Sequence, residues 1–135
     1  TAKGIPMPIK FTPAQYKNNI DPSAPPRYFT RATDLRRVDL EELAQSISEG
    51  GTTVGKADVY AVLIALTDEL ARRLPDGQSI HLGDLGYFYP VLKSDTVATA
   101  DEVRASSITE ANVRFAPGKR LKNEMKMAKF ERDSK

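Results

Sequence analysis

The residue types that most often do chemistry are scarce in this sequence. His81 is its one histidine, and there is no cysteine. A lone histidine in a strand-like segment is more often structural than catalytic. Carboxylates stand side by side in Glu41-Glu42 and Asp101-Glu102, and adjacent side chains point in different directions, unlike a catalytic pair. We therefore expect neither an enzyme nor a bound metal, cofactor or small-molecule substrate.

A turn with two glycines, "LGDLG" at residues 82–86, is the next candidate for chemistry. Glycine-rich loops bind phosphates through backbone N–H groups, but the nucleotide-binding patterns need GxGxxG or GxxxxGK[ST] spacing. Gly83 and Gly86 enclose only two residues, so the spacing excludes both patterns. The stretch instead predicts a hairpin turn between two strands.

The strongest chemical signal is a basic segment that begins with "VRFAPGKRLK". Between Arg114 and Arg132 the sequence has seven basic and two acidic residues. Lys119, Arg120 and Lys122 fall in the first turns of a predicted helix, where the helix dipole disfavours positive charge. A bound phosphate would reverse that penalty, because free N–H groups and flanking basic side chains would both contact it. The alternative is a basic amphipathic helix that packs on the core.

Charge is divided unevenly along the 135 residues, although the net charge is only +2. Residues 1–40 carry seven basic and three acidic side chains, and residues 114–135 carry eight basic and three acidic ones. Between them, residues 41–113 carry five basic and twelve acidic side chains. Basic ends indicate a nucleic acid or another acidic partner, although a solvated surface also gives this pattern. No run approaches the roughly 18 apolar residues of a membrane span. With no signal-peptide pattern at the start, we expect a cytoplasmic protein without membrane contacts.

Two helices are predicted before the glycine turn. Asp39 is an N-cap candidate with Glu42 three residues later, a capping-box spacing, and Gly50-Gly51 ends this helix. The second helix covers residues 56–74 and is apolar almost all round in its middle. Such a helix is buried on two sides. In so short a chain, we expect a partner subunit to cover the second side.

Strands follow these helices. Residues 80–82 and 87–92 predict two strands joined by the turn, residues 93–110 a long loop or flexible hairpin, and "ANVRFAP" a returning strand. The basic helix closes the chain, with an apolar side formed by Leu121, Met125 and Ala128. The order helix, helix, three strands, helix predicts an α+β fold.

Six of the nine prolines lie in residues 1–33, which excludes a helix through most of this segment. "MPIKF" and "RYFTRA" carry strand-like residues on either side of the loop "DPSAPP". We predict a proline-rich, largely extended arm at residues 1–34, able to add an edge strand, and one further domain at residues 35–135.

Three motifs, in the same order, resemble the HU/integration-host-factor family of bacterial histone-like DNA-binding proteins. "VRFAPGKRLKNEM" resembles the family's closing F-x-P-G-K-x-L-K stretch, "LGDLGYF" its G-F-G-x-F turn, and "VGKADVYAVLIALTDEL" its second helix. The likeness covers about residues 35–130, and the N-terminal extension resembles that of longer, HU-related proteins.

The resemblance implies an HU-like fold: two N-terminal helices, a three-stranded antiparallel sheet with a β-arm, and a C-terminal helix. It also implies an intertwined homodimer whose two arms hold double-stranded DNA in the minor groove. Such proteins are architectural and nucleoid-associated, bind with little regard to sequence, and condense DNA. The DNA-binding candidates are Lys93, Arg104, Arg114, Lys119, Arg120, Lys122 and Lys126.

Two departures from the family pattern qualify this expectation. The family's arm has a basic stretch with an Arg-Asn-Pro tip, whose proline wedges between base steps; residues 93–110 have no proline and four acidic residues. Asp84 stands where the family's turn has its first glycine, and a carboxylate beside a phosphate is unfavourable. We hypothesise that contacts the arm has lost are replaced by N-terminal basic residues, namely Lys10, Lys17, Arg27, Arg31, Arg36 and Arg37. The alternative function is an HU-fold dimerisation or protein-interaction module with weak or no DNA binding.

Overall fold

The computed structural model describes residues 7–134 and has an α+β architecture with three α-helices. Three single turns of 3-10 helix lie at residues 83–85, 100–102 and 105–107. In chain order the strands and α-helices are β1 (Ile9–Tyr16), β2 (Arg27–Ala32), α1 (Leu40–Glu49), α2 (Lys56–Arg73), β3 (Ile80–His81), β4 (Gly86–Ser94), β5 (Ile108–Pro117), α3 (Lys119–Lys126) and β6 (Phe130–Arg132).

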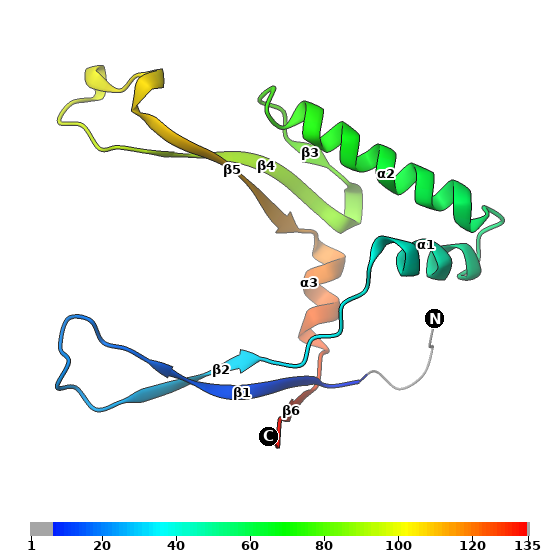
Figure 1. Cartoon of the computed structure of the whole chain (residues 1–135), viewed down its shortest axis with the longest axis horizontal. Coiled ribbons are helices and arrows are strands. Elements are labelled where there is room, and N and C mark those ends of the chain that lie inside the picture. Colours follow the sequence, from blue (N-terminus) through cyan, green and yellow to red (C-terminus); the bar gives the residue numbers. More distant parts are fainter. Residues whose placement is uncertain (1–6, 135) are drawn as a thin grey trace.

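Helices α1 and α2 form a packed pair whose limits follow the predicted signals (Figure 1). The Asp39 carboxylate caps α1 by accepting a hydrogen bond from the Glu42 N–H at 2.9 Å. This cap satisfies one of the N–H groups that a helix start leaves unpaired. Gly50 follows α1, and α2 runs on to Arg73.

The chain buries very little of its apolar surface by itself. Among the described residues, the buried apolar side chains are Ala44, Val59 and Leu74. On α2, Val62 is 65% exposed and Ile64 is 40% exposed, so the helix that is apolar almost all round is covered by its own chain on one side only.

The second half of the chain contains an antiparallel sheet of order β3-β4-β5. Strands β4 and β5 pair from Gly86 opposite Pro117 to Lys93 opposite Glu110, with an irregularity at Ser94. They form a long arm that projects from the body (Figure 1). The segment predicted as a long loop or flexible hairpin is the outer part of this arm, with two 3-10 turns near its tip.

Backbone packing ties the glycine turn to the start of α3. Gly86 has φ +129°, and a Cβ there would lie 2.2 Å from the carbonyl oxygen of Ala116. A Cβ on Gly118 would lie 2.3 Å from the carbonyl oxygen of Asp84. The Gly118 N–H also donates to the Leu85 carbonyl at 3.0 Å. Only glycine leaves room for this approach, so "LGDLG" and "PGK" form one structural unit.

The N-terminal residues form a hairpin within a second sheet. Strands β1 and β2 pair antiparallel, and β1 also pairs in parallel with β6, giving the order β2-β1-β6. The main-chain N–H of Ile9 donates to Lys129 O, and that of Asp133 donates to Phe11 O, both at 2.8 Å.

The predicted C-terminal helix is therefore too long. It ends at Lys126, and Ala128, placed on its apolar side by the sequence pattern, lies beyond it. The physical reason is that β1 offers an edge of unpaired backbone groups. Hydrogen bonds to that edge replace those of another helical turn, and Phe130 comes to lie beside Ile9.

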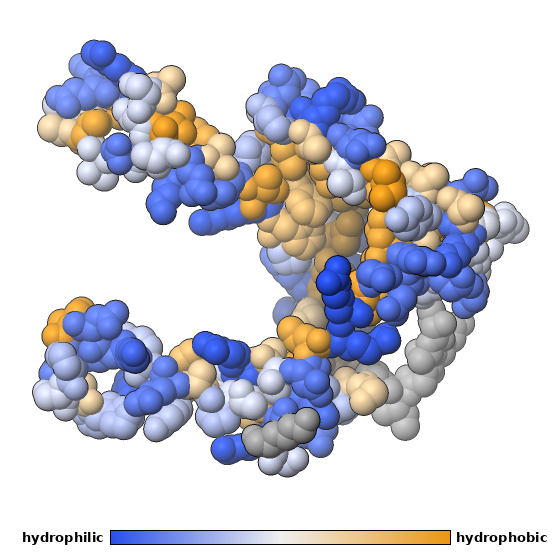
Figure 2. Space-filling model, in the orientation of Figure 1, coloured by the Kyte–Doolittle hydropathy of each residue, from blue (hydrophilic) through white to orange (hydrophobic). Residues whose placement is uncertain are grey.

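The two hairpins project to the same side of the molecule, with α3 between their bases (Figure 1). Figure 2 shows a wide notch between the β4–β5 arm and the β1–β2 hairpin, with apolar atoms gathered between α2 and the adjoining sheet. A groove of about 470 Å³ lies there, lined by Leu70, Leu74, Leu92 and Val113 among others.

Candidate nucleic-acid interface

The start of α3 presents free backbone donors. Gly118 is the N-cap residue and supplies no capping side chain. The first N–H to bond back along the helix is that of Lys122, which donates to the Gly118 carbonyl at 3.1 Å. Within residues 7–134, the preceding N–H groups of Lys119, Arg120 and Leu121 have no acceptor. This end of the helix is therefore suited to an anion.

Basic side chains surround these donors. Lys119, Lys122 and Lys126 are three and four residues apart, so they share one face of α3. Arg120 lies in the first turn, and the one acidic residue of the helix is Glu124. All four basic side chains are exposed and have no ion pair within the described chain. Three cations beside unpaired N–H groups, with Lys126 in the last turn of the helix, fit a polyanion better than a packed core.

The remaining predicted residues lie on the β4–β5 arm and fall into two places. Arg114 is on β5, opposite Tyr89 and close to the start of α3 along the strand. Lys93 lies farther out, opposite Glu110, whose carboxylate on the same face offsets its charge. Arg104 is in the outer loop, close in sequence to Asp101 and Glu102. Arg114 thus lies on β5, five residues before Lys119, and Lys93 lies opposite a carboxylate, whereas Arg104 is near carboxylates in sequence.

Other basic side chains are already engaged. Arg73 Nε and Arg72 Nη2 lie 2.7 Å and 2.6 Å from Glu69 Oε2. The hydrogen bond from Arg73 and the charge of Arg72 lower the pKa of Glu69 below its usual value. These arginines also carry positive charge at the C-terminal end of α2, where the helix dipole favours it. Both arginines are thus paired with Glu69 in this structure.

Asp84 belongs to the turn that packs on α3. Its carbonyl group abuts Gly118, and its side chain is exposed. The turn that carries this carboxylate therefore contacts the N-cap residue of α3 through its backbone. That the carboxylate disfavours an anion at the helix start stays a prediction.

The structure offers little for other kinds of chemistry. The His81 ring stacks on Tyr87 with ring centroids 4.6 Å apart, and its Nε2 lies 3.0 Å from Ser79 Oγ. Over residues 7–134, no three His, Asp or Glu side chains are arranged to hold a metal ion. Nor does that part of the chain contain a helix long and apolar enough to cross a bilayer.

A helical pair, a three-stranded sheet with a projecting arm, and a basic helix behind a glycine turn define an HU-like fold. Residues 7–132 match the family described as "HU domain fused to wHTH, Ig, or Glycine-rich motif" (HU-HIG). The match covers most of the sequence, so the chain belongs to this HU-related family. Among curated proteins, none is similar enough in sequence to count as a match.

Two solved structures share the fold. A putative bacterial DNA-binding protein from Bacteroides vulgatus superposes with a TM-score of 0.63 at 16% identity, over 92% of this chain and 47% of that one. HU from Anabaena in a cocrystal with DNA superposes with a TM-score of 0.50 at 18% identity, over 65% of this chain and 97% of that one. The chain thus spans about half the length of the Bacteroides protein.

Arg27 and Arg31 of strand β2 are among the N-terminal basic residues that the sequence offers as substitutes for arm contacts, although they are outside the list of seven DNA-binding candidates. Both are exposed, and neither has a carboxylate within ion-pair distance in the described residues. The sequence contains a signal for this face. In "RYFTRA", every second residue from the first is Arg27, Phe29 and Arg31, so these three side chains share one face of the strand.

Proposed function

We propose that this chain is an architectural DNA-binding protein that binds double-stranded DNA as a homodimer, largely without regard to sequence. The observation that carries the proposal is the start of α3, where unpaired N–H groups and the unpaired basic side chains of Lys119, Arg120 and Lys122 occur together. Phosphates would bind there by charge and hydrogen bonding, and neither interaction depends on the bases. The cocrystal of Anabaena HU with DNA supports DNA as the ligand of this fold. Such a protein would act on the chromosome in the bacterial nucleoid, and this location is part of the proposal.

The homodimer is supported by the surface that one chain leaves uncovered. The groove between α2 and the β4–β5 strands is lined largely by apolar side chains, and α2 also exposes Val62 and Ile64. Monomeric proteins rarely leave contiguous apolar patches of this kind in water. A second copy presents the same helix and the same groove, so a two-fold pairing would cover both at once.

A second candidate function is a dimerisation or protein-interaction module with weak DNA binding. The β4–β5 arm favours it, because residues 86–117 carry three basic and four acidic side chains. A negatively charged arm is repelled by phosphates. The arm therefore contributes less to affinity in our proposal than α3 does.

The decisive experiment titrates linear, bent and nicked duplexes at several salt concentrations. We compare the wild type with Lys119→Glu/Arg120→Glu/Lys122→Glu and with the charge-conserving control Lys119→Arg/Arg120→Lys/Lys122→Arg. We expect the logarithm of the binding constant to fall by about 0.9 per phosphate neutralised for each unit of log salt. The charge reversal should lower affinity at least tenfold, and the control should bind like the wild type.

Two outcomes would contradict the proposal. A flat salt response would exclude phosphate neutralisation as the mechanism, and equal binding by the charge-reversal variant would move the DNA surface away from α3. No binding by any of the three proteins would favour the protein-interaction module.

A further inference from the structure

The β1–β2 hairpin has a face on which arginines and aromatic rings alternate. In its register, Tyr16 lies opposite Arg27, Ala14 opposite Phe29, and Thr12 opposite Arg31. Residues directly opposite in an antiparallel pair share a face. One face of the hairpin therefore carries Tyr16, Arg27, Phe29 and Arg31, which we call the arginine–aromatic face.

This face is solvent-exposed and its charges are unsatisfied. Tyr16 is 56% exposed and Phe29 is 48% exposed. Neither arginine forms an ion pair within the described residues, whereas Lys10, nearer the base of the hairpin, lies 3.6 Å from Asp34. Residues 7–34 carry four basic and two acidic side chains, so this hairpin is positive while the β4–β5 arm is negative.

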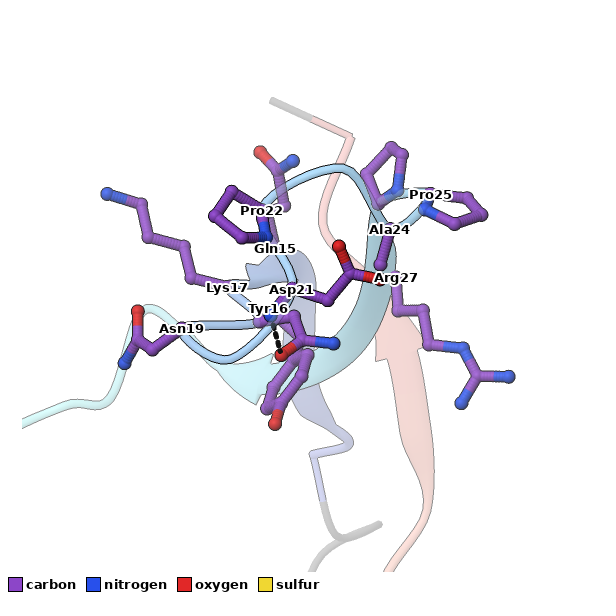
Figure 3. A pocket seen from close by; sticks show the side chains of 11 residues that line it. Gln15, Tyr16, Lys17, Asn19, Asp21, Pro22, Ala24, Pro25 and Arg27 are labelled. Carbon is purple, nitrogen blue, oxygen red and sulfur yellow. Dashed lines mark hydrogen bonds between the residues drawn. The ribbon is translucent and has the colours of Figure 1, made fainter.

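Side-chain caps and prolines order the loop at the tip. Asn18 Oδ1 accepts hydrogen bonds from the N–H groups of Ile20 and Asp21 at 3.0 and 3.1 Å. Asp21 Oδ1 accepts from the N–H and the hydroxyl of Ser23 at 3.1 and 2.6 Å. Pro22, Pro25 and Pro26 fix the backbone further. Figure 3 shows the loop curled around a hollow, with the Lys17 and Arg27 side chains extending outward on opposite sides.

Ile20 is the exception in this polar loop. Its side chain is 96% exposed and takes no part in lining the hollow. An ordered loop thus holds a branched aliphatic side chain in water, a position in which it stabilises nothing in its own chain. A rigid apolar tip pays little ordering entropy when it enters a partner.

We propose that the β1–β2 hairpin is a second DNA-binding arm, in which Arg27 and Arg31 bind phosphates and Ile20 inserts between base pairs from the minor groove. Proteins that bend DNA from that groove insert aliphatic wedges of this kind between base steps. The proposal rests on the DNA-binding function proposed above and adds a second surface to it. Each subunit contributes one hairpin, so the dimer kinks the duplex at two steps.

The base of the hairpin is fixed in a way that suits this role. Pairing of β1 with β6 attaches it directly behind α3, and the Thr33 N–H donates to Lys10 O at 2.8 Å where the hairpin closes. The base of the hairpin is therefore tied to the chain just after the basic helix, and the hairpin projects to the same side of the molecule as the β4–β5 arm (Figure 1).

The first test uses the full chain and Ile20→Ser, with Val103→Ser as matched control. Val103 is a 63% exposed aliphatic residue near the tip of the other arm. The probes are a duplex with fluorophores at both ends, which reports bending, and duplexes containing 2-aminopurine, which brightens when bases unstack. We expect Ile20→Ser to bind within about threefold of the wild type but to lose most of both signals. Val103→Ser should keep both signals. The reverse pattern, or full signals with Ile20→Ser, would overturn the wedge.

The second test measures the arginines. Arg27→Gln/Arg31→Gln removes four arginines from the dimer, so it should lower the salt slope of log affinity by about 3.6, since each neutralised phosphate contributes about 0.9. The control Arg27→Lys/Arg31→Lys should keep the slope. An unchanged slope with glutamine would overturn the phosphate contacts. A change in the molar mass of the glutamine variant in sedimentation would also overturn them, because it would assign the face to the subunit interface. So would a loss of affinity by that variant for single-stranded DNA alone, because it would assign the face to base stacking.

Failure of this inference is distinct from failure of the proposed function. If the wild type binds duplexes and the α3 charge reversal abolishes binding, while the hairpin variants behave like the wild type, the hairpin alone is not a DNA-binding arm. If the wild type does not bind duplexes at all, the proposed function fails and the second arm fails with it.

Discussion

Gly86 and Gly118 decide where α3 can lie. Both glycines sit at backbone-to-backbone contacts that leave no room for a Cβ atom. Asp84 lies in the same turn, and its side chain is exposed. The same few residues therefore bear on the stability of the fold and, under the proposed function, on the affinity of the helix start for phosphate.

Gly86→Ala should destabilise the protein by about 3 kcal/mol or more, because the new methyl group meets the Ala116 carbonyl and because φ is +129°. Gly83→Ala is the matched control. Gly83 has φ +60° but open space around a Cβ, so only the backbone strain remains and the cost should be about 1 kcal/mol. Urea unfolding measures both changes. Equal losses for the two variants would show that the close contact is unimportant.

Asp84→Asn should strengthen duplex binding about two- to fivefold at low salt, because it removes a carboxylate beside the proposed phosphate site. The gain should shrink as salt screens the interaction. Asp76→Asn, in the turn after α2, makes the same change of charge away from α3 and should have little effect. A titration in which both variants gain equally would point to net charge rather than to position.

At the residue scale, local signals in the sequence were sufficient for some features. The Asp39 cap and the glycines that follow α1 were predicted, because capping depends on neighbours within one turn. The sequence marks "LGDLG" as a turn but gives no sign of its contact with Gly118. That contact joins segments about thirty residues apart, and only the fold brings them together.

At the scale of elements, strand β6 is the least predictable part of the chain. The pattern of "KRLKNEMKMAKF" is helical, and the helix ends because the chain reaches the edge of β1. Hydrogen bonds to a distant strand override local preference here, which no short window of sequence reveals. The partner strands β1 and β2 were visible as strand-like runs, but their pairing as a hairpin was not predicted.

Removal of residues 130–135 should loosen the β1–β2 hairpin and leave the helical pair intact. The deletion eliminates the bond from the Asp133 N–H to Phe11 O and exposes one edge of β1. Amide hydrogen exchange should become at least tenfold faster in β1 and β2, while amides of α1 and α2 keep their protection. Faster exchange throughout would instead mean that β6 supports the whole fold.

At the scale of the whole molecule, the fold class and the order of the helices and of the central sheet were predicted from periodicity and motifs. Membership of an HU-related family confirms the resemblance on which the prediction relied. The β2-β1-β6 sheet was not predicted. It pairs residues 9–11 with residues 130–132, and sequence patterns do not reveal contacts between segments so far apart.

One chain buries few apolar side chains by itself, so we expect a loss of dimerisation to lower the stability of the fold as well. Val62→Asp places a carboxylate on the exposed apolar side of α2, where burial against a second subunit would cost several kcal/mol. We expect a shift toward monomer in sedimentation equilibrium and a lower Tm that no longer rises with protein concentration. Met127→Asp, after the end of α3 and 74% exposed, should leave the dimer unchanged. A dimer that tolerates Val62→Asp would exclude this side of α2 from the interface.

The parallel pairing of β1 with β6 also has a consequence for the order of folding. Residues 9–11 pair with residues 130–132, so this contact closes a loop that spans nearly all of the described chain. Closing so long a loop is entropically costly, and contacts distant in sequence form late. During synthesis the hairpin cannot be anchored until the ribosome has released residues 130–132. The helical pair and the β3-β4-β5 sheet can fold before then, so the basic hairpin takes its position after them.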